Sequence, residues 1–213
     1  MDPEAVALVI VDISGYTQFI RFHRTTLPHA QEVTSQLLES VIDKASHPLV
    51  LNKLEGDAAF LYAALGDDPA AAARDIAGQV AGFFAAFHGR ARDLSAGRAG
   101  CACDACQRIR DLQLKAVLHV GEASFRRIRQ FEELAGEDVI LVHRLLKNSV
   151  AAHEYVLMTE SFHRLLGDAG AAWGEARVEA YDDLGPVAVR VSYPTASPGM
   201  ADRTDSKGMP FVI

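Results

Sequence analysis

An uninterrupted apolar run near the N-terminus, Ala5–Val11, is the feature that most constrains how this chain can fold. The run follows Glu4 and stops at Asp12, and it is far shorter than the ~20 apolar residues that cross a bilayer as a helix. A short run rich in Val and Ile is typical of a strand that is buried on both faces. The sequence therefore predicts a central strand over residues 5–11, with other elements packed on each side of it.

The rest of the chain alternates between short β-rich runs and longer helical ones, which indicates a mixed α/β domain. Further strands are predicted over 49–51, 58–62, 112–120, 154–159, 173–181 and 187–193, and helices over 15–25, 29–46, 69–93, 136–148 and 160–167. The first two of these strands flank a Gly-Asp turn and are expected to form a hairpin. The 213 residues fit one domain, predicted over 1–193 with a cysteine-containing loop inserted at 95–107 and a flexible tail at 194–213.

Composition and charge limit the kinds of partner that such a domain can have. With 49% hydrophobic and 23% charged residues, the chain has enough apolar material for a core. The net charge of −7 argues against a protein that mainly coats nucleic acid or an anionic membrane, because that binding relies on Lys and Arg. The N-terminus lacks the pattern of a signal peptide. The three cysteines are odd in number and clustered, which suits a reducing compartment. We therefore expect a soluble, cytoplasmic protein with no nucleic-acid and no membrane partner.

Two aspartates stand where the predicted sheet would bring them together. Asp12 follows the first strand and precedes a helix start, so it could hold a hard divalent cation or cap the helix. Asp57 lies in the predicted hairpin turn, where aspartate is also an ordinary turn residue. If the hairpin lies beside the first strand, the two carboxylates converge into a Mg²⁺ or Mn²⁺ site for nucleotide phosphates. Backbone amides at the helix start could bind phosphate oxygens, and they belong to Ser14, Gly15, Tyr16 and Thr17.

Four segments, in this order, resemble motifs of the class III nucleotidyl cyclase catalytic domain. They are residues 12–17 (DISGYT), 53–57 (KLEGD), 118–121 (LHVG) and 136–145 (GEDVILVHRL). The resemblance spans most of residues 6–193 and implies an α/β (α+β) fold of the ferredoxin-like, class III cyclase type, in which helices pack on a central and mainly antiparallel sheet. Together with the cysteine loop, residues 118–121 and 138–148 also resemble a group of uncharacterised bacterial proteins that keep the cyclase core.

The resemblance implies a metal site and a base-reading site. Asp12, Ile13 and Asp57 would be the ligands of Mg²⁺ or Mn²⁺ ions that bind a purine nucleoside triphosphate. The segment 14–17 would contact the same nucleotide. Lys53 stands where the family places its purine-reading lysine, and Glu133 falls near the acidic base-reading position.

The resemblance also implies a catalytic role for Arg144 alongside Lys53. An arginine at this helix position stabilises the charge that develops on the leaving pyrophosphate. The family usually donates that arginine from the other subunit of a dimer, so a homodimer is implied.

Two features depart from active cyclases. The helix position that is asparagine in active members is Ile140 here, so the group that orients the ribose is missing. Near the last hairpin, where active members carry a basic turn, this chain has Tyr181-Asp182-Asp183, and carboxylates repel phosphate. We therefore favour a nucleotide-binding and metal-binding module with weak or no turnover. The alternatives are an active cyclase that converts ATP or GTP to the 3′,5′-cyclic nucleotide and pyrophosphate, and a structural interaction protein.

A second metal site is predicted in the inserted loop. Cys101, Cys103 and Cys106 offer three thiolates, enough for three corners of a tetrahedral Zn²⁺ site. His88, on the preceding predicted helix, is the nearest candidate for the fourth ligand, and Asp104 or a partner chain could also serve. The alternative interpretation is three exposed free thiols.

Overall fold

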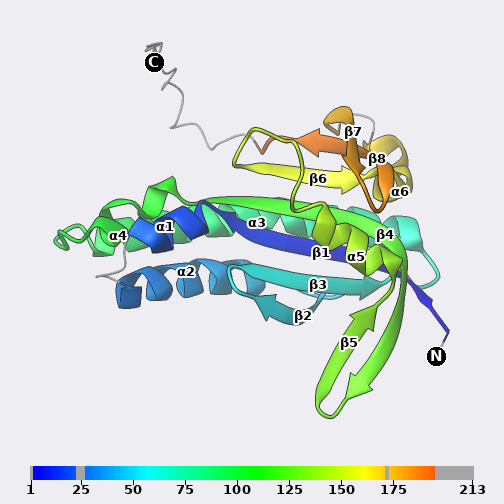
Figure 1. Ribbon diagram of the computed structural model, residues 1–213, viewed down its shortest axis with the longest axis horizontal. Coiled ribbons are helices and arrows are strands. Elements are labelled where there is room, and N and C mark those ends of the chain that lie inside the picture. Colours follow the sequence, from blue (N-terminus) through cyan, green and yellow to red (C-terminus); the bar gives the residue numbers. More distant parts are fainter. Residues whose placement is uncertain (1, 23–26, 171–172, 195–213) are drawn as a thin grey trace.

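The computed structural model describes residues 2–22, 27–170 and 173–194 of the chain (Figure 1). The predicted central strand is present as β1 (Glu4–Ser14), which is longer than predicted at both ends. Residues 6–11 have no exposed surface, and alternate side chains of β1 enter two separate hydrophobic cores. The strand is therefore covered on both faces, as its apolar sequence requires.

Among the described residues, eight strands form one sheet around β1. The hairpin of β2 (Val50–Glu55) and β3 (Ala58–Ala64) pairs with one edge of β1, and β4 (Gln113–Ile128) pairs with the other, all antiparallel. Beyond β4 lie β6 (Tyr155–Thr159), β8 (Gly185–Ser192) and β7 (Glu175–Tyr181), in that order. The β4–β6 pair is parallel, whereas β8 is antiparallel to both of its neighbours. The predicted class, a mixed fold with a mainly antiparallel sheet, is confirmed.

Strand β4 departs most from the sequence prediction, which ended it at residue 120. It runs on to Ile128, turns at Arg129 (φ 58°) and returns as β5 (Phe131–Ala135), and this hairpin extends beyond the body of the sheet (Figure 1). Gly121 does not end the strand. A Cβ at this position would lie 2.1 Å from Cγ of Asp138, so the glycine makes room for a neighbouring side chain.

Helices cover both faces of the sheet. On one face, α2 (Leu27–Ile42), α3 (Pro69–Gly97) and α6 (Glu160–Leu166) pack over the larger core. On the other face, α5 (Glu137–Arg144) closes the smaller core. The short elements are α1 (Tyr16–Phe22), α4 (Asp104–Gln107) and the 3₁₀ turns Ile109–Asp111 and Gly167–Gly170.

Several predicted boundaries need correction. Helix α3 runs to Gly97 rather than to residue 93, and α4 lies inside the predicted loop 95–107. Helix α5 ends at Arg144 rather than at residue 148, and the described part of the first predicted helix is α1. Residues 195–213 of the predicted tail lie outside the described residues. None of the helices in the described ranges is long and apolar enough to cross a membrane.

Candidate functional site

The two aspartates singled out from the sequence lie side by side. Asp12 is near the carboxyl end of β1, and the amide of Ile13 donates a hydrogen bond to the carbonyl oxygen of Asp57 in the β2–β3 turn (3.2 Å). Burial, followed by the negative charge of neighbouring Asp12, raises the pKa of Asp57 to about 6. A divalent cation between the two carboxylates would relieve their mutual repulsion. This donor set therefore fits Mg²⁺ or Mn²⁺, to which buried Ile13 could add only its carbonyl oxygen.

A third charged group, Lys115 of β4, lies beside Asp12 and Asp57. It was not identified from the sequence. It stands directly opposite Asp12 in the β1–β4 ladder, and its Nζ lies 2.9 Å from Oδ2 of Asp12. The two side chains are only 19% and 16% exposed, so water screens this ion pair weakly. The ammonium partly neutralises the carboxylates and orients Asp12. Only knowledge of the sheet order could have predicted this contact.

A cavity of about 430 Å³ opens beside Asp57, between α2 and the β2–β3 hairpin. Its α2 wall is largely polar and includes Gln31, Thr34, Ser35 and Glu39. Of the predicted phosphate-binding segment, Tyr16 lines this cavity, Ser14 is buried and Thr17 is exposed. Gly15 has a φ of 88°, which allows the sharp turn from β1 into α1. Of this segment, the structure therefore places Tyr16 at the cavity that contains Asp57.

Lys53 and Glu133, to which the resemblance assigns base recognition, contact each other. Nζ of Lys53 lies 2.5 Å from Oε2 of Glu133, which the β4–β5 hairpin brings up to β2. Both residues line a cavity of about 260 Å³, together with Asn52. The Oδ1 atom of Asn52 is buried and has no hydrogen-bond partner among the described residues. The cavity is therefore lined by a cation and a carboxylate, which are groups that can read the hydrogen-bonding edge of a purine.

Arg144, at the end of α5, is paired with the acidic turn between β7 and β8. Its Nη2 lies 2.6 Å from Oδ2 of Asp183, and both side chains are 48% exposed. One helical turn earlier, Ile140 is 55% exposed and offers no hydrogen-bonding group. Both α5 residues line a cavity of about 400 Å³. The acidic turn thus supplies a partner for Arg144 from within the same chain.

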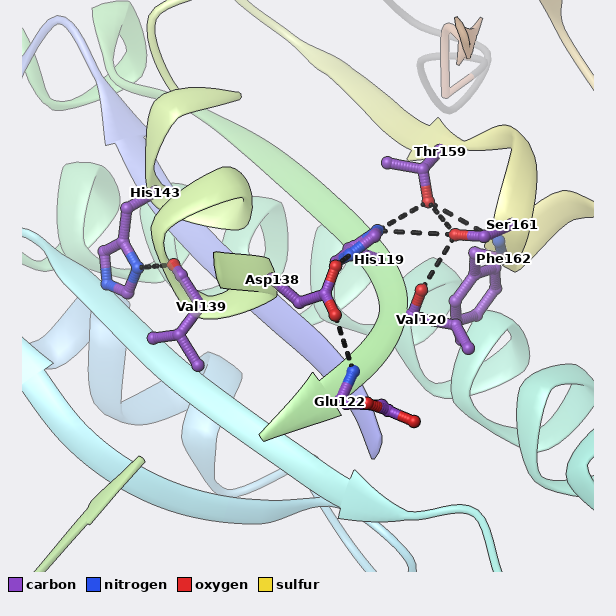
Figure 2. A network of polar contacts seen from close by, with 9 residues as sticks. All are labelled: His119, Val120, Glu122, Asp138, Val139, His143, Thr159, Ser161 and Phe162. Atoms are coloured by element: carbon purple, nitrogen blue, oxygen red, sulfur yellow. Dashed lines mark hydrogen bonds and ion pairs between the residues drawn. The ribbon is translucent and has the colours of Figure 1, made fainter. Parts of the chain in front are cut away.

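His119 of β4 lies at the centre of a buried polar network (Figure 2). Its Nε2 lies 2.8 Å from Oδ1 of Asp138 at the start of α5, and its Nδ1 lies 2.9 Å from Oγ1 of Thr159 at the end of β6. Asp138 also accepts a hydrogen bond from the amide of Glu122 (2.7 Å). Burial lowers the pKa of His119 although Asp138 opposes this effect, so the ring is neutral near pH 7. The network ties α5 to β4 and β6 and so positions the helix that carries Arg144.

The three loop cysteines lie together, next to His29 of α2. Nδ1 of His29 lies 3.4 Å from Sγ of Cys103 and 3.8 Å from Sγ of both Cys101 and Cys106. All four ligand atoms lie within 4.8 Å of one another, so the group could hold a metal ion. Nothing in the sequence pointed to His29, because 74 positions separate it from Cys103.

His88, the fourth ligand suggested by the sequence, lies elsewhere. It precedes the end of α3 by nine residues, and a helix rises about 1.5 Å per residue, so its side chain is carried away from the loop. Its Nε2 lies 2.8 Å from Oε2 of Glu154. The structure therefore places His29, and not the predicted His88, beside the three cysteines.

Comparison with known proteins places the chain in a family without an assigned function. Residues 34–155 match the family described as "Protein of unknown function (DUF2652)", and the chain belongs to that family. The uncharacterized protein Rv2561/Rv2562 of Mycobacterium tuberculosis is 39% identical over 135 residues. The match covers 63% of this chain and 61% of that protein, so the chain spans about three fifths of its relative.

Solved structures with a similar fold are nucleotidyl cyclases and a cyclase-like protein. The guanylyl cyclase Cya2 has a TM-score of 0.69 at 14% identity, over 89% of this chain and 92% of that one. The adenylyl cyclase CyaB from Pseudomonas aeruginosa has a TM-score of 0.67 at 12% identity, over 90% and 95%. A class III adenylyl cyclase-like ATP-binding protein from the same organism has a TM-score of 0.63 at 12% identity, over 76% and 35%. At such identities the likeness establishes the fold, and the cyclase-type fold expected from the motifs is confirmed.

We expect Gly121→Ala to destabilise the protein. Its Cβ would lie 2.1 Å from Cγ of Asp138, so Asp138 must move and break its hydrogen bonds with His119 and Glu122. Leaving a buried polar group unpaired costs about 1–3 kcal/mol in the free energy of unfolding. Gly78→Ala is the matched control, because nothing lies within 4 Å of its Cβ and alanine favours a helix interior by about 0.5–1 kcal/mol. Urea unfolding should show opposite signs for the two variants, and equal effects would contradict the role of Asp138.

In the presence of a chelator, we expect Asp57→Asn to be more stable than the wild type at alkaline pH. The folded-state pKa of about 6 lies above the ordinary aspartate value, so the folded state gains stability from the proton on Asp57 at low pH. That contribution is lost as the pH rises through the folded-state pKa. Asparagine carries no ionisable group, so the difference in melting temperature should grow from about pH 5 to about pH 8.

Asp67→Asn is the control for this experiment, since Asp67 is exposed. Differential scanning fluorimetry across this pH range provides the measurement. A difference between Asp57→Asn and wild type that does not change with pH would show that Asp57 ionises normally in the fold.

Proposed function

We propose that this protein is a cyclase-fold module that binds a purine nucleoside triphosphate together with Mg²⁺ or Mn²⁺, with weak or no turnover. The observation that carries the proposal is the position of Asp57, which lines a cavity of about 430 Å³ and whose pKa is raised to about 6 by burial and by the neighbouring charge of Asp12. Two neighbouring carboxylates repel each other and lower the stability of the folded protein unless a cation binds between them. One solved neighbour is itself described as an adenylyl cyclase-like ATP-binding protein, which is compatible with binding as a function of this fold.

The residues at the site have complementary roles in this proposal. Asp12 and Asp57 hold the ion, with the carbonyl oxygen of Ile13 as a further ligand, and the bound ion neutralises the triphosphate. The segment 14–17 contacts the phosphates from the edge of the cavity. Lys53 and Glu133 recognise the base from the cavity between β2 and β5.

Two features of α5 support weak turnover. Arg144 must leave Asp183 before it can stabilise a leaving pyrophosphate, and that ion pair is 2.6 Å long. Ile140 presents an exposed apolar side chain where a ribose would need a hydrogen-bonding group. The retained carboxylates and Arg144 support the alternative function, an active cyclase that makes a 3′,5′-cyclic nucleotide from ATP or GTP.

We further propose that the module is a cytoplasmic homodimer. The cyclase resemblance implies it, because Arg144 would act in the nucleotide site of the other subunit. Exposed apolar side chains, one at each of the three cavities, support it: Leu54 is 57% exposed, Phe131 60% and Ile140 55%. Large apolar groups of this kind are enriched in the cores of protein interfaces.

We expect titration calorimetry to detect binding of ATP or GTP in the presence of Mn²⁺, without a matching yield of cyclic nucleotide. Asp57→Ala should abolish metal-dependent binding because the ion loses one of its two carboxylates. Asp67→Ala, which removes an exposed aspartate outside the site, should bind as the wild type does. Binding together with catalytic turnover would support the active cyclase instead, and the absence of binding would leave the structural interaction protein.

We also expect Ile140→Asn combined with Asp183→Asn to increase cyclic nucleotide formation. The first change restores a hydrogen-bonding group on α5, and the second frees Arg144 from its internal partner. Since one well-placed electrostatic donor is worth about 10²–10³ in turnover, a gain of about tenfold or more is expected. Ile140→Asn combined with Asp182→Asn is the matched control, because it leaves Asp183 in place. An equal yield from both double variants would show that Asp183 does not restrain Arg144.

A further inference from the structure

We propose that His29, Cys101, Cys103 and Cys106 form a structural zinc centre that fastens the start of α2 to the segment between α3 and β4. The proposal concerns a part of the molecule that is distinct from the carboxylate pair. It requires no nucleotide, so it stands or fails independently of the proposed function.

The spacing of the four ligand atoms fits a tetrahedral ion. Zn–S bonds of about 2.3 Å and Zn–N bonds of about 2.0–2.1 Å place nitrogen and sulfur ligands roughly 3.6 Å apart at tetrahedral angles. The distances from Nδ1 of His29 to the three sulfur atoms are 3.4, 3.8 and 3.8 Å. An ion at the centre of the four atoms can therefore reach each of them with little movement of the chain.

The chemistry of the ligands selects the metal. Soft thiolates with one imidazole favour zinc over Mg²⁺ or Ca²⁺, which prefer oxygen ligands. Four protein ligands leave no open position for water or substrate, which is the pattern of a structural site and not of a catalytic one. Cys103 and Cys106 are separated by two residues, a common spacing of paired zinc ligands.

Contacts around the four residues support the ligand positions. The amide of Cys101 donates to the carbonyl oxygen of Arg98 (2.9 Å), and its own carbonyl oxygen accepts from the side chain of Gln107 (2.8 Å). The guanidinium of Arg98 lies 4.0 Å from Sγ of Cys106 and pairs with Glu32 of α2 at 2.6 Å. Three thiolates, one zinc ion and one neutral imidazole carry a net charge of −1, and the guanidinium of Arg98 lies beside this charge while it also pairs with Glu32.

The centre would have a clear mechanical consequence. The segment that contains the cysteines lies between two long elements, α3 and β4, and forms only the short helix α4 and a 3₁₀ turn. His29 lies in the first turn of α2, whose later turns form the wall of the cavity beside Asp57. The ion would therefore fix the end of a helix that shapes this cavity.

The test measures the metal directly. Full-length protein purified without a chelator should contain about one zinc ion per chain by elemental analysis. After removal of zinc, addition of Co²⁺ should give the absorption of a tetrahedral thiolate complex, and hydrogen exchange over residues 27–42 should be faster in the metal-free protein than in the zinc-loaded one. Wild-type protein that takes up neither metal, or whose three thiols titrate freely after addition of zinc, would overturn the proposal.

Variants identify the ligands. His29→Ala should lose stoichiometric zinc, His29→Cys should retain it with a fourth thiolate, and His88→Ala should behave as the wild type because His88 pairs with Glu154. Arg98→Ala should weaken zinc binding about 10–100-fold in a competition with a chelator, since groups outside the ligand shell contribute this much. Zinc bound equally well by His29→Ala and wild type would show that His29 is not a ligand. The cobalt spectrum of the wild type provides a test even if a variant does not fold.

Discussion

The burial of β1 on both faces is the constraint on which the rest of this structure depends. Residues 6–11 are fully covered, with alternate side chains in the two cores, and a strand so apolar has no stable place at an edge or on a surface. Helices must therefore pack on both faces, and other strands must pair with both edges. Asp12 is the first charged residue after the apolar run, so its carboxylate emerges where the core ends. The location of the candidate metal site is thus a consequence of how the core is built.

Charged groups near the candidate site are matched by partners from within the chain. Asp12 pairs with Lys115, Lys53 with Glu133, and Arg144 with Asp183. A ligand with phosphate groups must compete for these cations, and the cost is highest where the pair is best shielded from water. Asp57 is the exception, because its neighbour is another carboxyl group and its pKa rises to about 6. Because Asp57 has a carboxyl neighbour where the other charged groups have a partner of opposite charge, a divalent cation is the expected partner of Asp12 and Asp57.

The inserted segment between α3 and β4 has little regular secondary structure to stabilise it. Between α3 and β4 the chain forms only a short helix and a 3₁₀ turn, yet Cys106, Ala105 and Ile109 are buried there. A metal ion held by His29 and the three cysteines would stabilise such a segment with few apolar contacts, as metal ions do in small domains. The matched family segment, residues 34–155, includes the cysteines and Asp57, whereas Asp12 and His29 precede it.

The sequence by itself determined the fold class, the central strand and the hairpin, because these follow from local patterns such as an apolar run and a Gly-Asp turn. It predicted the approach of Asp12 to Asp57 only if the hairpin lies beside the first strand, and the pairing of β1 with β3 meets that condition. It also indicated that Lys53 and Glu133 belong to one site, through the resemblance of its motifs. Only the tertiary structure decided the partners that depend on long-range packing. Lys115 meets Asp12 through the register of β1 and β4, and His29 reaches the cysteines through the packing of α2. Strand order and helix packing arise from the whole core, so no short segment of sequence encodes them.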